Sequence, residues 1–104
     1  MNETTAPESM TIKVQTILYL KKIVGAPEIE ISVPRGCTLQ GLLEKLANNR
    51  GEELASHLFK PNSTEILPHL RLMINGRDIG FLDGMKTELH DGNEVLILPP
   101  VSGG

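Results

Sequence analysis

The sequence is poor in cysteine, in clustered positive charge and in long apolar stretches, and each shortage excludes a class of protein. A single cysteine, Cys37, excludes an internal disulfide. Ten basic residues stand against thirteen acidic ones, and only Lys21 and Lys22 are adjacent. Nucleic-acid binding depends on clustered Lys and Arg, so we expect no nucleic-acid partner. Neither a leader pattern nor an apolar stretch near membrane-spanning length appears, so we expect a cytoplasmic protein outside the membrane.

The length is right for one folded domain. The chain has 104 residues, of which 39% are apolar, which is enough for one hydrophobic core and too little for two. Residues 1–9 contain a proline and no apolar periodicity, so we expect a disordered N-terminal arm there. The folded domain is expected to span residues 10–98, and residues 99–104 are expected to form an extended tail.

Alternating apolar residues and a high content of β-branched residues predict the strands. The clearest turn is Asn75-Gly76, because a type I′ hairpin needs positive φ at both central residues. The last predicted strand is a nearly continuous apolar run, which is typical of a strand buried on both faces. The strands are expected at residues 11–19, 28–33, 70–74, 77–79 and 94–98.

One main amphipathic helix is predicted between the second and third strands. Thr38 is placed to cap it by accepting a hydrogen bond from a backbone amide two or three residues ahead. A shorter helical pattern covers residues 52–59, and residues 60–69 are expected to form a loop. The apolar stripe of the main helix consists of Leu39, Leu42, Leu43, Leu46 and Ala47.

The order of these elements indicates an α+β fold of the β-grasp, or ubiquitin-like, type. Parallel pairing of the first and last strands would place the buried last strand at the centre of the sheet. The main helix would then cross one face. We therefore expect a mixed sheet of four to five strands packed on one main helix.

The candidate site lies after the last strand. Two consecutive prolines remove two amide donors and stiffen the backbone, so sheet pairing must end there. The four residues that follow them reach about 13 Å at roughly 3.3 Å each. Two glycines without Cβ atoms would pass through a narrow channel and leave a terminal carbonyl open to a nucleophile. The segment consists of Pro99, Pro100, Val101, Ser102, Gly103 and Gly104.

A simpler interpretation is that the glycines are a frayed chain end. Their position directly after a core strand and a proline pair weakens that interpretation. The stretch from Leu89 to Gly104 resembles the C-terminal signature of the small subunit of molybdopterin synthase. That subunit belongs to the wider family of ubiquitin-like sulfur carriers, together with thiamine-biosynthesis carriers and small archaeal-type modifiers.

The similarity in element order extends from Met10 onward, but only the last segment is specific to the motif. Residues 1–9 and 52–69 make this chain longer than compact members of the family. Aromatic residues are also scarce here, whereas relatives often place phenylalanine in the first strand. These differences leave the pathway open and do not affect the tail.

The resemblance implies a mechanism based on Gly104. A ubiquitin-activating-like adenylyltransferase would use ATP to convert its carboxylate to an acyl-adenylate, and a persulfide donor would then displace AMP to leave a thiocarboxylate. The sulfur would pass to a pterin precursor in the large subunit of molybdopterin synthase. On this basis the chain is a carrier rather than an enzyme, and binds neither cofactor nor metal itself.

Three alternatives stay open. The first is a thiamine-type sulfur carrier. The second is a covalent modifier, in which a lysine amine captures the activated Gly104. The third is a ubiquitin-like interaction domain with an inert tail. A stand-alone enzyme has the least support, because no nucleophile with its base, metal set or phosphate loop appears in the sequence.

A carrier must be held while its tail is threaded into a partner, so exposed apolar residues on the sheet are candidates for a docking face. The candidates are Met73, Ile79 and Phe81. Cys37 is expected to be a small apolar residue before the main helix, with a redox role as the weaker alternative.

The remaining polar candidates have simple structural explanations. The three histidines are far apart in sequence and have no cysteine or carboxylate at ligand spacing, so we expect them at the surface. Asp83, Asp91 and Glu94 are better explained by turn geometry than as an acid-base set, because two of them are next to glycines. The histidines are His57, His69 and His90.

Overall fold

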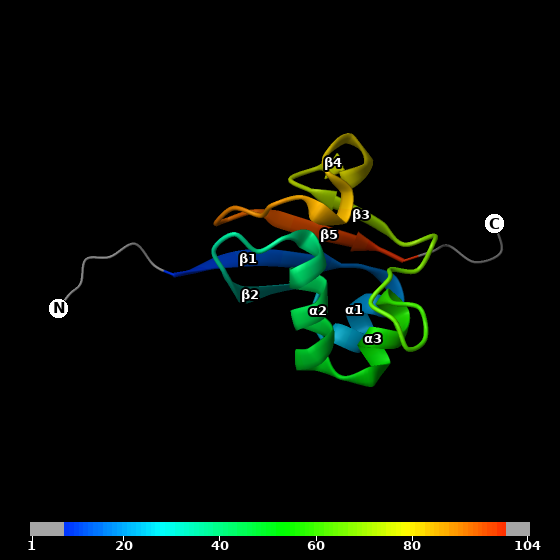
Figure 1. Cartoon of the computed structure of the whole chain (residues 1–104). Helices are drawn as coiled ribbons and strands as arrows, with labels where there is room; N and C mark the ends of the chain where they lie inside the picture. The colour runs from blue at the N-terminus through cyan, green and yellow to red at the C-terminus, as the bar shows by residue number, and fades with distance from the viewer. Residues whose placement is uncertain (1–7, 100–104) are drawn as a thin grey trace.

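The structure, a computed structural model, describes residues 8–99 and has the predicted order of elements with one added helix (Figure 1). Two 3₁₀ turns, η1 (Ile79–Phe81) and η2 (Gly84–Lys86), follow the fourth strand. The helices are α1 (Leu18–Val24), α2 (Leu39–Arg50) and α3 (Glu52–Leu58). The strands are β1 (Ser9–Thr16), β2 (Glu28–Pro34), β3 (Arg71–Ile74), β4 (Arg77–Asp78) and β5 (Glu94–Leu98).

The strands form a five-stranded mixed sheet in the order β2-β1-β5-β3-β4. The first and last strands pair in parallel, with Val14 opposite Val95, and the other pairs are antiparallel. This arrangement confirms the β-grasp prediction and places β5 at the centre. The Asn75-Gly76 turn is also confirmed, with φ values of 51° and 82°.

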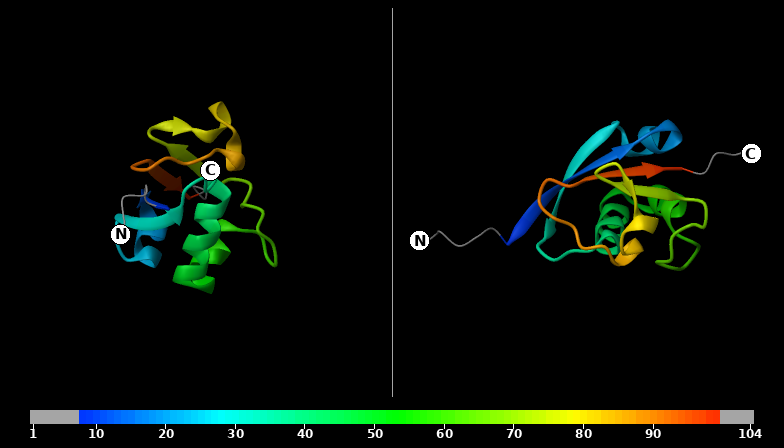
Figure 2. Two further views of the ribbon diagram at one scale, coloured as in Figure 1. Left: turned by 60° about the vertical axis from the view of Figure 1, so that its left-hand side comes forward. Right: turned by 90° about the horizontal axis from the view of Figure 1, so that it is seen from above.

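The core lies between the sheet and the helices, which pack on one face of it (Figures 1 and 2). Alternation along β1 turns Met10, Ile12 and Val14 toward the helices, where all three are buried. The predicted stripe of α2 is buried against them. No helix within residues 8–99 has the length and apolar character needed to cross a bilayer.

The prediction that β5 is buried on both faces is wrong. Val95 and Ile97 are buried on the helix side, whereas Leu96 and Leu98 are only half-buried. The reason is that the helices cover only one face of the sheet. The opposite face, which we call the open face, leaves these two leucines partly accessible to solvent.

The first strand differs from its predicted range at both ends: it begins earlier and ends earlier than expected. It was expected to continue to Tyr19, but β1 ends at Thr16 and α1 begins at Leu18. Ser9, which was assigned to the N-terminal arm, is the first residue of β1. The Arg35 amide extends the pairing by donating to the Glu8 carbonyl oxygen at 3.0 Å. The rest of the predicted arm lies outside the described residues.

Helix α1 forms because its sequence meets the core at helical spacing. Leu20 and Val24, four residues apart, are both buried. Gly25 ends the helix with φ of 94°, and its amide donates to the Lys21 carbonyl oxygen at 2.8 Å. A positive φ at this position favours glycine. The spacing of these apolar residues and the glycine after them were signals of a helix in the sequence.

The predicted N-cap of α2 is confirmed and leads to a stability prediction. The Thr38 side chain accepts a hydrogen bond from the Gly41 amide at 3.3 Å. We expect Thr38→Ala to lower the free energy of unfolding by about 1 kcal/mol, measured by urea denaturation, because that amide loses its partner. Thr64→Ala in the exposed loop before β3 is the control and should stay within about 0.5 kcal/mol. Equal stability of the two variants would contradict the capping role.

Candidate functional site

The central strand β5 leads directly to the predicted tail. It ends at Leu98, and the next residue, Pro99, is buried. Of the six predicted tail residues, Pro99 is within the described part of the chain. Pro100, Val101, Ser102, Gly103 and Gly104 lie outside it, so their predicted role stays a prediction. The segment therefore starts from a position that is fixed by the body of the domain.

Two neighbouring strands flank the end of β5. On one side the last pair of the parallel ladder joins Thr16 to Ile97, and on the other side Arg71 is opposite Leu98. Thr16 is buried, and its hydroxyl donates to the Ala26 carbonyl oxygen at 3.2 Å. We call this place the exit. Figure 2 shows α1 beside the exit, where the chain continues from β5.

Three consecutive large apolar residues are exposed beside the exit. Ile17, Leu18 and Tyr19 are exposed by 39%, 57% and 39%, and we call them the exit rim. Ile17 joins β1 to α1, and Leu18 and Tyr19 are the first two residues of α1. The Tyr19 ring packs at 5.2 Å from the ring of His57 in α3, tilted by 52°. This contact attaches one part of the rim to the helical layer.

The backbone of the rim is strained at Leu18. Its φ of 57° lies in the left-handed region, which costs a residue with a Cβ atom roughly 1–2 kcal/mol. Sequence reasoning missed this site because it read Ile17 to Tyr19 as the continuation of a strand. The helical spacing of Leu20 and Val24 could have revealed the break, but the exposure of the rim depends on the register of β1.

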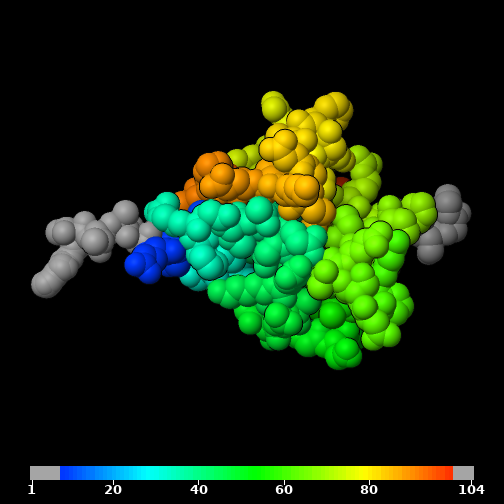
Figure 3. Space-filling view, in the orientation of Figure 1, coloured from blue at the N-terminus to red at the C-terminus, as the bar shows by residue number. Residues whose placement is uncertain are grey.

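The predicted docking residues do not lie on one surface element. Met73 is half-buried on the open face, opposite Leu96. Ile79 and Phe81 lie in η1, after the edge strand, in the yellow segment at the top of Figure 3. Ile79 packs partly against the core, whereas Phe81 is 82% exposed. Their use as a docking face stays a prediction.

The open face carries ion pairs around its apolar centre. Lys13 lies 3.7 Å from Glu28 and 3.9 Å from Glu94. Arg71 lies 3.2 Å from Asp78, which also accepts from the Gly80 amide at 2.8 Å. The Gly80 amide first, and then the Arg71 guanidinium, lower the pKa of Asp78. These exposed pairs fix side-chain positions more than they stabilise the fold.

Cys37 has the environment of a structural residue. Its thiol is half-buried and donates to the Thr38 carbonyl oxygen at 3.3 Å. Burial raises the pKa of the Cys37 thiol, which reduces the thiolate that redox chemistry needs. A Cβ atom added at Gly41 would lie 2.9 Å from its sulfur, so the thiol fills the space beside α2. These contacts favour the predicted packing role.

The acidic residues of the proposed alternative acid-base set act separately in turns and ion pairs. Asp91 accepts from the Thr11 amide at 2.8 Å, and Glu94 faces Lys13. The Asp83 carbonyl oxygen accepts from the Lys86 amide at 3.1 Å in the turn that contains η2. Within residues 8–99, no three His, Cys, Asp or Glu residues come together in a group able to hold a metal ion.

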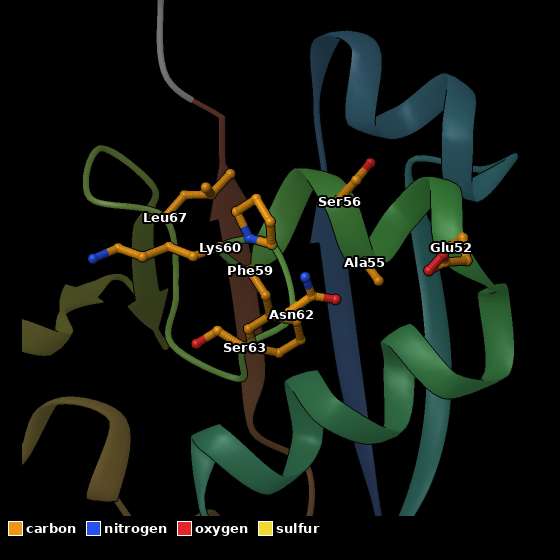
Figure 4. A pocket seen from close by; sticks show the side chains of 9 residues that line it. Glu52, Ala55, Ser56, Phe59, Lys60, Asn62, Ser63 and Leu67 are labelled. Atoms are coloured by element: carbon orange, nitrogen blue, oxygen red, sulfur yellow. The ribbon is translucent and has the colours of Figure 1, made fainter.

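A groove lies between α3 and the loop before β3 (Figure 4). Its volume is ≈ 640 Å³, and its lining includes the apolar Phe59 and Leu67 as well as the charged Lys60 and Glu52. A second groove of ≈ 690 Å³ lies between the Asn75 turn and the turn that contains Asp83. The Ser56 hydroxyl of the first lining donates to the Glu53 carbonyl oxygen, and the Thr87 hydroxyl of the second donates to the Gly84 carbonyl oxygen, so neither donates to a base.

Comparison with known proteins places the chain among small ubiquitin-like proteins. The model of the ThiS family matches residues 17–104. The small archaeal modifier protein 3 of Haloferax volcanii is 33% identical over 95 residues, covering 91% of this chain and 100% of that protein. The sulfur carrier protein CysO of Mycobacterium tuberculosis is 32% identical over 98 residues, covering 92% and 99% of the two chains. The solution structure of the HVO 2177 protein of Haloferax volcanii has a TM-score of 0.78 at 30% identity, covering 99% of this chain and 94% of that one.

Proposed function

This chain belongs to the ThiS family of ubiquitin-like sulfur carriers, and we propose that it carries sulfur as a thiocarboxylate on Gly104. The observation that supports this proposal best is the position of Pro99, from which the tail starts. The central strand β5 ends at Leu98, the buried Pro99 follows it, and the family match continues from there through Gly104. A rigid base of this kind lets the body of the domain position a short reactive segment in a partner.

The proposed chemistry has three steps. The Gly104 carboxylate attacks the α-phosphate of ATP in a partner adenylyltransferase, which releases pyrophosphate and forms an acyl-adenylate. The terminal sulfur of a persulfide donor then attacks the acyl carbon, and AMP leaves, which gives an acyl disulfide. A thiol of the donor system attacks the donor's sulfur in that bond, so the thiocarboxylate is released and a disulfide forms on the donor.

The acceptor that we propose is the large subunit of a molybdopterin synthase, where the tail would give its sulfur to a pterin precursor. The support is the resemblance of residues 89–104 to the C-terminal signature of that family. In this role the chain contributes sulfur and fit, and the partners contribute the catalytic side chains.

A second candidate function is covalent modification of other proteins. The 33% identity to a small archaeal modifier protein favours it. The chemistry differs only in the last step, because a lysine amine would attack the activated acyl carbon and form an isopeptide bond. Both functions use the same activated Gly104, so one protein can perform both.

Intact-mass analysis of the protein purified from its source cells tests the proposal. We expect a population heavier by about 16 Da, since sulfur replaces one carboxylate oxygen. Glycine-glycine remnants on lysines of other proteins, found after proteolysis, would identify the modifier function instead. Finding neither product, together with no ATP-pyrophosphate exchange with an adenylyltransferase from the same cells, would contradict both functions and favour an inert tail.

A further inference from the structure

The exit rim includes an exposed apolar side chain, that of Leu18, which the fold itself does not require. Leu18 is 57% exposed, so its side chain adds little to the core. Glycine would adopt its φ of 57° without strain, and asparagine would adopt it more easily than leucine does. Strain retained at an exposed leucine indicates a role outside the packing of the domain. Contiguous exposed apolar residues of this kind mark interaction sites.

The length of the segment after the exit determines what must cover the rim. Five residues follow Pro99 up to and including Gly104, and fully extended they span at most about 17 Å at roughly 3.3 Å each. A protein that binds Gly104 beside ATP must therefore bring the mouth of its channel close to Pro99. Because the end of β1 pairs next to the end of β5, that mouth must also come close to Ile17 and Leu18.

We propose that the exit rim is the surface on which the mouth of the adenylyltransferase channel sits when it takes up the tail. The inference depends on the proposed adenylation of Gly104 and adds a contact surface to it. Burial of three large apolar side chains would hold the carrier at the distance where Gly104 reaches ATP. The Tyr19–His57 ring contact keeps one side of the rim in place before binding.

Two substitutions of Leu18 test the rim without disturbing the fold. Leu18→Asn keeps the side-chain length close to that of leucine and tolerates the left-handed backbone, and Leu18→Gly removes both side chain and strain. We expect each to leave the melting temperature unchanged or raised. In ATP-pyrophosphate exchange with the adenylyltransferase from the same cells, each should raise the KM for the carrier at least about tenfold. The kcat should stay the same because the reacting segment is unaltered.

The matched control is Asn62→Gly in the loop before β3. Asn62 is exposed and has φ of 55°, so this substitution changes the backbone in the same way without removing an apolar side chain. Its KM should equal that of the wild-type chain. If the wild-type chain supports ATP-pyrophosphate exchange and both Leu18 variants have the same KM as the wild-type chain, the rim proposal is overturned and the proposed function stands. If the wild-type chain does not exchange, both proposals are overturned.

Discussion

Deletion of Gly104 alone is expected to reduce ATP-pyrophosphate exchange with the adenylyltransferase at least about 100-fold, while thermal unfolding stays as in the wild-type chain. The deletion still leaves a glycine carboxylate, on Gly103, but withdraws it by roughly 3.3 Å. Misplacement of a reacting group by about 1 Å can already cost on the order of 100-fold in rate. Because the tail starts from the buried Pro99, the body of the domain offers little slack to restore the lost length.

Removal of Thr5 is the matched control, since it shortens the chain by one residue before β1 begins. The Thr5 deletion should support ATP-pyrophosphate exchange at the wild-type rate. If the Gly104 deletion also supported ATP-pyrophosphate exchange at that rate, the distance of the carboxylate from Pro99 would not matter. The proposal that the body of the domain sets this distance would then be wrong. If both deletions lost activity, the loss could not be assigned to the tail.

The parts of the fold that the sequence predicted correctly depend on local patterns. The stripe of α2 and its Thr38 cap follow from spacing alone, because neighbours on a helix face are three or four residues apart. The Asn75-Gly76 turn follows from the backbone angles that those two residues tolerate. The parallel pairing of β1 with β5 is not local, and the buried last strand and the order of elements were needed to infer it.

The elements that the sequence did not predict depend on tertiary contacts. The run from Ile17 to Tyr19 has the apolar, partly β-branched composition of a strand, but in the structure α1 begins at Leu18, whose backbone is left-handed. Contacts of Leu20 and Val24 with the core override the local preference. In the same way, the nearly continuous apolar run of β5 could not show that helices cover only one face of the sheet.

The same distinction between local pattern and tertiary contact applies to the candidate site. The tail was identified from a motif, Pro-Pro followed by a small residue and Gly-Gly, that is readable without any structure. The exit rim was not identified, because its place beside the tail depends on a pairing between residues about 80 positions apart, such as Thr16 and Ile97. A motif can therefore reveal the reacting group, whereas the surface that presents it follows only from the fold.

Leu43→Ala is expected to lower the free energy of unfolding by about 2–5 kcal/mol, because Leu43 is fully buried where α2 meets the sheet. For a domain of about 100 residues each kcal/mol shifts the melting temperature by roughly 4–8 °C, so calorimetry should show a fall of about 8–40 °C. Phe81→Ala, at a side chain that is 82% exposed, should stay within about 0.5 kcal/mol of the wild-type value.

The same variant separates stability from function. Leu43 is buried in the core and is part of neither the exit nor the exit rim, so the folded fraction of Leu43→Ala should react with the adenylyltransferase at the wild-type kcat and KM. Exchange would then fall only as the folded population falls, and measurements well below the melting temperature should match the wild-type chain. A raised KM at a temperature where the variant is fully folded would mean that the core and the exit are coupled. The presentation of the tail would then depend on the packing of α2 as well as on the exit rim.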